Sequence, residues 1–229
     1  MLIFAHRGAS ADAPENTLLA INLALSQDAD GIEIDVYQSD KDLVVIHDRW
    51  LHRTTNGQGQ VQDYSLAELK RLDAGQGQQI PTLWQVMQMI NGRCILNIEI
   101  KGVTDLALVL AHMDKAQNEL NFCLEQFIVS SFDHHLLQAI KTLHPGLKIG
   151  VLTASKPIDY AFFAHKLGAY SVNIDISVID QAFVKDAKAR GLKVFVYTVD
   201  KKEDLLLLRD WQVDGVFCNA PGKAKEILA

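Results

Sequence analysis

Eight short runs of apolar and β-branched residues recur along the chain, and the stretches between them, such as Asn16–Ser26, have the periodicity of helices. This alternation is typical of a parallel sheet covered by helices, because parallel neighbours need a crossover connection. The predicted strands are Leu2–His6, Gly31–Val36, Cys94–Lys101, Gln126–Phe132, Lys148–Thr153, Ser171–Ile176, Lys193–Val199 and Gly215–Asn219. Eight strand–helix units predict an α/β fold closed into a (β/α)₈ barrel, the TIM barrel, for which 229 residues is compact. An open, doubly wound sheet is the alternative.

One segment interrupts this alternation. Asp42–Ile46 is an additional extended run, and residues 49–79 are polar and contain several glycines around one short predicted helix, Leu66–Arg71. Loops longer than about 12–15 residues in compact domains are usually functional or disordered. We therefore expect one barrel domain over residues 1–229, with a small cap inserted after the second strand, at about residues 49–79, beside the C-terminal rim.

Composition excludes several other classes of protein. No run reaches the roughly 18 apolar residues of a membrane span. The 22 basic and 28 acidic residues give a net charge of −6 without a basic stretch, which argues against a nucleic-acid partner. The three cysteines, Cys94, Cys123 and Cys218, are odd in number and lack CxxC spacing, so a reducing compartment is expected. The start, MLIFAHRG, does not resemble a secretory signal, and we expect a cytoplasmic protein.

Two of the predicted strands carry charged residues where a buried parallel strand is normally apolar. In IEIDV, Glu33 and Asp35 are two positions apart, so both side chains leave the strand on the same face. In ILNIEIKG, the same alternation puts Asn97, Glu99 and Lys101 on one face. Because the intervening isoleucines and leucine pack outward against helices, the polar face lies inside the barrel, at its mouth.

Three carboxylates on neighbouring strands repel one another unless they are paired or bind a cation. A divalent cation held by Glu33, Asp35 and Glu99 removes that conflict, and all-oxygen ligation favours Mg²⁺ or Ca²⁺ over zinc or copper. The alternative is an internal salt-bridge network with Lys101 that only holds the barrel together. One lysine cannot neutralise three carboxylates, and the ends of barrel strands are where such folds place catalytic groups.

Two histidines also fall at strand ends, His6 in FAHRG and His47 in VVIHD. Arg7 and Gly8 follow His6 and supply a fixed cation and a flexible backbone, which together suit a phosphate. An imidazole pair can act as base and acid on opposite sides of phosphorus. If either histidine is instead a metal ligand, the site is still hydrolytic. The remaining histidines are read as structural: His52, His112, His134, His135, His144 and His165.

Taken in order, these motifs resemble those of the glycerophosphodiester phosphodiesterase family. The matching segments are AHRGAS at the start, PENT at Pro14–Thr17, IEIDV at Ile32–Val36, IHD at Ile46–Asp48, IPTL at Ile80–Leu83, IEIKG at Ile98–Gly102, SSF at Ser130–Phe132 and VDGVF at Val213–Phe217. The ordered set covers essentially the whole chain. The resemblance implies a (β/α)₈ barrel with a small cap after the second strand.

The resemblance also implies a site and a reaction. Glu33, Asp35 and Glu99 would bind one divalent cation, Mg²⁺ or Ca²⁺, while Arg7 and Lys101 would contact the phosphate. The substrate would be a small glycerophosphodiester, such as glycerophosphocholine or glycerophosphoethanolamine, cleaved to glycerol 3-phosphate and an alcohol. Compact bacterial members of the family are cytoplasmic, and a homodimer is an open option.

His6 and His47 would form the acid–base pair, and we assign His6 as the base and His47 as the acid. The resemblance favours the glycerol 2-hydroxyl as first nucleophile, which gives a cyclic phosphate that water then opens. Direct attack by water on phosphorus is the alternative.

Other positions are secondary candidates. Glu15 in PENT is either a site residue or part of a favourable helix start. Phe132 and Tyr197 lie at strand ends, where they would pack against glycerol carbons of the substrate or against their neighbours. Family members often carry tryptophan at the position of Tyr197 and Thr-Asp where this chain has Cys218-Asn219.

Two other functions compete with this one. A lysophospholipase D, or a phosphodiesterase for sugar-linked or phosphoinositol diesters, would use the same chemistry on another substrate. A catalytically silent barrel would bind a glycerophosphodiester without cleaving it, but a pure binder needs no histidine placed for proton transfer.

Overall fold

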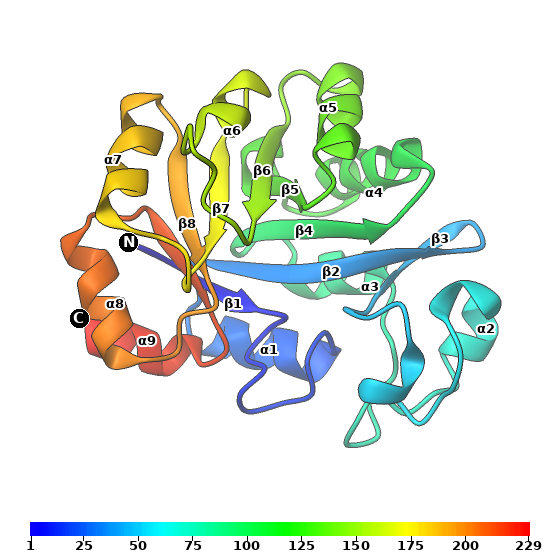
Figure 1. Cartoon of the computed structure of the whole chain (residues 1–229). Coiled ribbons are helices and arrows are strands. Elements are labelled where there is room, and N and C mark those ends of the chain that lie inside the picture. The colour runs from blue at the N-terminus through cyan, green and yellow to red at the C-terminus, as the bar shows by residue number, and fades with distance from the viewer.

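The computed structural model describes all 229 residues as a closed barrel of parallel strands surrounded by helices (Figure 1). Eight strands form the barrel: β1 (Leu2–His6), β2 (Gly31–Ser39), β4 (Ile95–Gly102), β5 (Phe127–Ser131), β6 (Lys148–Thr153), β7 (Ser171–Asp175), β8 (Lys193–Tyr197) and β9 (Gly215–Cys218). The α-helices are α1 (Leu18–Ser26), α2 (Leu66–Leu69), α3 (Leu83–Ile90), α4 (Leu106–Glu119), α5 (His134–Leu143), α6 (Phe162–Lys166), α7 (Gln181–Ala189), α8 (Lys202–Asp210) and α9 (Pro221–Leu228).

Hydrogen bonding of β1 on both edges closes the barrel. One edge pairs in parallel with β2, where His6 lies opposite Glu33, and the other pairs with β9, where Phe4 lies opposite Phe217. The predicted TIM barrel is therefore confirmed, and the open sheet is wrong, because an open sheet would leave β1 or β9 without a second neighbour.

Side chains alternate between the outer and the inner face of each strand, so the barrel has one hydrophobic core outside the strands and another inside them. Outward-facing residues such as Ile32, Ile34 and Ile98 pack against the helices in a cluster of 48 buried residues. A smaller cluster, which includes Phe4, Phe195 and Phe217, fills the inside of the barrel. Inward positions of β1, β8 and β9 thus contribute aromatic rings, whereas β7 contributes the buried polar pair Ser171 and Asn173 from its first residue on.

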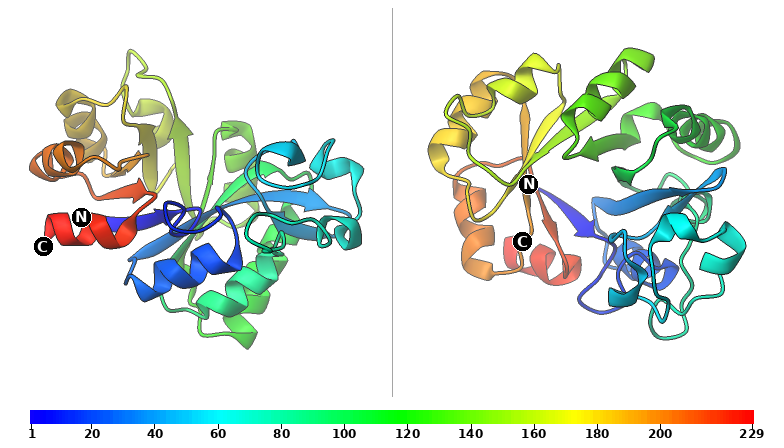
Figure 2. Two further views of the ribbon diagram at one scale, coloured as in Figure 1. Left: turned by 90° about the horizontal axis from the view of Figure 1, so that it is seen from below. Right: turned by 45° about the vertical axis from the view of Figure 1, so that its right-hand side comes forward.

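The interruption after the second strand begins as a hairpin. β3 (Asp42–Val45) pairs antiparallel with the end of β2. The segment that follows contains two short 3₁₀ helices, η1 (Leu51–Arg53) and η2 (Val61–Asp63), and the predicted helix is limited to the four residues of α2. A small cluster of its own, including Leu51 and Leu69, holds the segment together. Figure 2 shows from two further directions that this segment, in cyan, stands outside the ring of strands.

Two expectations about the surroundings of the chain can be compared with the structure. None of its helices combines the length and the apolar character needed to cross a bilayer. All three cysteines are free thiols, with Cys94 and Cys218 buried and Cys123 exposed.

Close packing at the base of the barrel generates a first prediction. A Cβ at Gly31 would lie 2.4 Å from the ring of Phe4, which is held by Phe195 and Phe217 at ring-centroid distances of 5.1 and 5.0 Å. Gly31→Ala should therefore lower the free energy of unfolding by about 1–3 kcal/mol. Thermal denaturation should show a lower Tm, by about 2–4 °C per kcal/mol.

The matched control is Gly146→Ala. Gly146 is exposed, and the nearest atoms to an added Cβ are 3.8 Å away, an ordinary contact. Its Tm should stay close to that of the unmodified protein. Equal melting temperatures for the two variants would contradict this account of the barrel base.

Candidate active site

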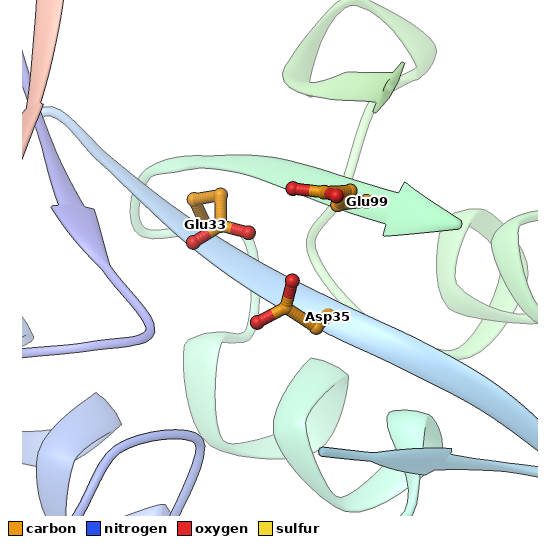
Figure 3. A group of neighbouring side chains, drawn as sticks. All are labelled: Glu33, Asp35 and Glu99. Atoms are coloured by element: carbon orange, nitrogen blue, oxygen red, sulfur yellow. The ribbon is translucent and has the colours of Figure 1, made fainter. Parts of the chain in front are cut away.

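The polar side chains predicted from the strand alternation converge at the carboxyl ends of β1, β2 and β4. Strand register brings them together, because His6 lies opposite Glu33 and Asp35 lies opposite Glu99. Figure 3 shows the side chains of Glu33 and Asp35 on β2 and Glu99 on β4 grouped in one region. The geometry therefore unites residues that are far apart in the sequence.

The three carboxylates form a close acidic cluster. One oxygen from each lies within 4.8 Å of the others, and Glu33 and Asp35 are 3% and 1% exposed. Burial, followed by repulsion from the neighbouring carboxylates, raises the pKa of Glu33 well above its ordinary value. Burial and the charge of Asp35 also raise the pKa of Glu99. Both shifts express the free-energy cost of holding these negative charges together.

Two basic side chains partly offset this charge. Lys101 Nζ lies 2.8 Å from Glu99 and 3.3 Å from Asp35, and Arg7 Nε lies 3.3 Å from Asp35. Burial alone would lower the pKa of Lys101, but the carboxylates of Asp35 and Glu99 outweigh it and raise that pKa. The salt-bridge network considered as an alternative is thus present.

The network leaves polar atoms unsatisfied. Glu33 Oε1 is buried with neither a hydrogen bond nor an ion pair. Asp35 Oδ1 and Arg7 Nε have no hydrogen bond either, and their only polar contacts are ion pairs at 3.3 Å, with Lys101 Nζ and with the other oxygen of Asp35. Buried polar groups are normally hydrogen-bonded, so acceptors and a donor that lack hydrogen bonds in one site call for explanation. A bound cation would satisfy the carboxylate oxygens, and an anion would satisfy the guanidinium. Three carboxylate ligands suit a hard divalent ion.

His6 is held by residues from the far end of the chain. Its Nδ1 lies 2.8 Å from Asn219 Oδ1, while the Asn219 amide nitrogen donates to Asp200 Oδ2 at 2.6 Å. The bond to Asp200 fixes the amide orientation, so Asn219 presents only an acceptor to His6. Burial, followed by the charge of Arg7, lowers the pKa of His6 to about 4. Neutral His6 therefore carries its proton on Nδ1 and leaves Nε2 free.

His47 is held by a different kind of partner. Its Nδ1 lies 2.6 Å from Asp48 Oδ1, and Arg53 donates to the other oxygen of Asp48. Arg53 also donates two bonds to Glu15, at 2.6 and 2.9 Å. Burial lowers the pKa of His47, while the charge of Asp35 and the hydrogen bond that His47 donates to Asp48 oppose that shift.

Glu15 belongs to this ion-pair network, and it lies outside the helix start. Helix α1 begins at Leu18, with Thr17 as its N-cap, so Glu15 precedes the first turn. Its carboxylate lies 2.9 Å from Arg7 Nη1. Although burial acts in the opposite direction, hydrogen bonds from Arg53 and the charge of Arg7 lower the pKa of Glu15.

A cavity of about 260 Å³ lies over these groups. Its walls include both predicted histidines, both predicted phosphate contacts, and both predicted aromatic residues: His6, His47, Arg7, Lys101, Phe132 and Tyr197. The rings of Phe132 and Tyr197 meet edge to face at 6.1 Å between centroids. The Tyr197 hydroxyl donates to the backbone oxygen of Thr153 at 2.9 Å, so the ring is fixed at one side of the cavity.

Several supporting residues were missed by the sequence analysis. Asn16 donates to Asp35 at 2.9 Å and so orients one of the carboxylates, and Asn219, Asp200 and Arg53 hold the histidines. Asn16 is the third residue of the PENT motif at Pro14–Thr17, and its place in that motif is the one sequence feature that could have indicated its role. Nothing in the sequence pairs Asp200 or Arg53 with the site.

Comparison with known proteins agrees with this geometry. The fold and the site define a TIM-barrel enzyme of the phosphoric diester hydrolase class. The model of the glycerophosphoryl diester phosphodiesterase family matches residues 6–223, and the chain belongs to that family, as its motifs indicated.

Individual relatives give the same result. A glycerophosphodiester phosphodiesterase of Caldanaerobacter subterraneus is 41% identical over 96% of this chain and 94% of its own length. A glycerophosphodiester phosphodiesterase of Bacillus altitudinis is 34% identical over 98% of this chain and 97% of its own length. The structure of an Oleispira antarctica phosphodiesterase in complex with the product sn-glycerol-3-phosphate has a TM-score of 0.90 and 33% identity, and covers 100% of this chain and 96% of that one.

Repulsion within the acidic cluster generates a second prediction. In the presence of a chelator at neutral pH, Glu33→Gln should raise the free energy of unfolding by about 1 kcal/mol or more, because it removes a buried like charge. A carboxylate whose pKa is raised by folding destabilises the protein as pH rises above its ordinary pKa. The gain in Tm should therefore be larger at about pH 8 than at about pH 5.

Glu226→Gln provides the control, because Glu226 is exposed and makes no ion pair. This variant should melt like the unmodified protein at both pH values. A lower Tm for Glu33→Gln than for the control under chelation would contradict the assigned repulsion.

Proposed function

We propose that this chain is a divalent-cation-dependent phosphodiesterase that hydrolyses glycerophosphodiesters to glycerol 3-phosphate and an alcohol. The observation that carries the proposal is the acidic cluster with its unsatisfied oxygens, two members of which, Glu33 and Glu99, line the same cavity as His6 and His47. Family membership and the product bound to the Oleispira relative support the substrate class. We also propose that residues 1–229 act as one catalytic domain, with residues 49–79 as its cap.

Glu33, Asp35 and Glu99 would hold one divalent cation, Mg²⁺ or Ca²⁺. When bound, such a cation supplies positive charge to the phosphate oxygens as negative charge builds on them. Arg7 and Lys101 line the same cavity and would bind the remaining phosphate oxygens. Their existing ion pairs with Asp35 and Glu99 keep both side chains in place before substrate arrives.

His6 would act as the base. Asn219 accepts the Nδ1 hydrogen, so the lone pair on Nε2 is available to take a proton from the nucleophile. The depressed pKa of His6 keeps it unprotonated at neutral pH. We propose the glycerol 2-hydroxyl as nucleophile, with a cyclic phosphate then opened by water.

His47 would act as the acid. Asp48 accepts a hydrogen bond from Nδ1 and stabilises the imidazolium, which leaves the Nε2 hydrogen for the departing alkoxide. Phe132 and Tyr197 lie across the same cavity and would contact the glycerol carbons. The free thiols support a reducing compartment, and we propose the cytoplasm as the place of reaction.

Turnover of defined substrates tests the proposal directly. Purified protein should release glycerol 3-phosphate from glycerophosphocholine, glycerophosphoethanolamine or glycerophosphoinositol. A chelator should abolish the release, and added Mg²⁺ or Ca²⁺ should restore it, because the carboxylate cluster has no other counter-charge sufficient for three anions. No release with either metal would contradict the proposal and favour a lysolipid substrate or a non-catalytic barrel.

The acid–base assignment has its own test. His6→Gln and His47→Gln should each lower kcat by about 10²–10⁴-fold, because each removes one proton transfer. Both variants should keep the rise in Tm that the divalent cation causes, since neither histidine is proposed as a ligand. His135→Gln, which alters an exposed residue of α5, should retain normal turnover. Near-normal kcat in either of the first two variants would refute the assignment.

A further inference from the structure

A second cavity opens beside the proposed active site, and we propose that it binds the leaving alcohol and favours head groups that carry an anionic substituent over cationic ones. This inference rests on the proposed diesterase function and adds the substrate class to it. The cavity measures about 480 Å³ and is formed mainly by the cap segment that follows His47. His47, Asp48 and Lys101 on its wall belong to the proposed reaction, whereas Arg49, Trp50 and His52 have no part in the reaction described above.

The position of the second cavity relates it to the leaving group. It shares His47 and Lys101 with the first cavity, so these two side chains form the boundary between them. The first cavity is lined by His6, by the aromatic residues and by two members of the acidic cluster, Glu33 and Glu99. An alcohol that takes its proton from His47 must leave past that side chain, which places its substituents in the second cavity.

The charge of this cavity is predominantly positive. Its lining contains Arg49, Arg53 and Lys101 but only one carboxylate, that of Asp48. Asp48 already pairs with Arg53, and Lys101 already pairs with Glu99. Arg49 is exposed and makes no ion pair with any carboxylate. An anionic substituent would therefore find one arginine whose charge is not already compensated.

Trp50, which also lines the cavity, does not reverse the preference for an anionic substituent over a cationic one. Trp50 is 40% exposed and offers a ring face of the kind that binds quaternary ammonium groups. However, the guanidinium of Arg49 lies over that ring, with Cζ 5.8 Å from the ring centroid. A choline group would have to displace Arg49 or approach its like charge. The ring thus serves to position the arginine.

The backbone of this segment is held in place by the cap. Val61 N–H donates to the backbone oxygen of Arg49 at 2.9 Å, and Trp50 forms an antiparallel bridge with Gln60. Leu51 N–H donates to Gly59 O at 3.0 Å. Arg49 and Trp50 consequently project from backbone that is hydrogen-bonded to the segment 59–61, which lowers the entropy lost when a head group binds.

The test compares substrates that share the glycerol and differ in head-group charge. The substrates are glycerophosphoinositol 4-phosphate, glycerophosphoinositol and glycerophosphocholine, and all three release glycerol 3-phosphate. We expect kcat/KM to be highest for the 4-phosphate and lowest for the choline ester. The advantage of the 4-phosphate over its uncharged parent should shrink as ionic strength rises.

Arg49→Gln should reduce the ratio of kcat/KM for the 4-phosphate to that for glycerophosphoinositol by about tenfold, the usual size of one hydrogen bond to a charged group. The parent substrate should be cleaved at nearly the original rate. Arg71→Gln removes the same charge from an exposed cap residue outside the cavity and should leave the ratio unchanged. This control separates a local contact from a general effect of net charge.

The outcomes distinguish this inference from the function on which it rests. No glycerol 3-phosphate from any of the three substrates would overturn the proposed function and, with it, the head-group selectivity. Release with equal efficiency for all three, a preference for choline, or a ratio unaffected by Arg49→Gln would overturn the selectivity alone. A preference for the 4-phosphate that disappears in Arg49→Gln but persists in Arg71→Gln supports it.

Discussion

Mutual repulsion among Glu33, Asp35 and Glu99 is the constraint to which the rest of the site responds. Three carboxylate oxygens within 4.8 Å of one another, at positions almost removed from water, cannot all remain charged without compensation. Arg7 and Lys101 provide part of the compensation. Glu33 Oε1 and Asp35 Oδ1 still lack hydrogen bonds, and this residual demand for positive charge is the reason we propose a cation at the cluster.

The barrel tolerates this arrangement because its interior changes character along the strands. Near their start, Phe4, Phe195 and Phe217 fill the inside with close aromatic contacts, and Gly31 is required beneath Phe4. Two residues farther along β1 the same inward face carries His6. The apolar base contributes stability that the acidic mouth does not, so repulsion at the mouth does not prevent folding.

The alternation of residues along a strand was sufficient to predict which face of the sheet a side chain occupies. Glu33 and Asp35 are two residues apart, and a strand must place them on one face, so the acidic cluster could be predicted without coordinates. Contacts between residues that are far apart in the sequence could not be predicted from this alternation. The bond from Asn219 to His6 joins residues 213 positions apart, and no periodicity relates them. The start of α1 also differed from the expected Asn16, because Thr17 is the residue whose side chain caps the helix.

The partners of the two histidines differ in charge, and this difference separates their chemistry. Asp48 presents a carboxylate to His47 and favours its protonated form, whereas Asn219 presents a neutral oxygen to His6 and does not. The replacement of the family's frequent aspartate by asparagine at position 219 is compatible with Asp200, which accepts hydrogen bonds from both the backbone and the side chain of Asn219. A carboxylate at position 219 would face Asp200 without a proton to share. The asparagine, which directly follows β9, therefore keeps a polar contact with His6, and this neutral partner suits the role of base that we propose for that imidazole.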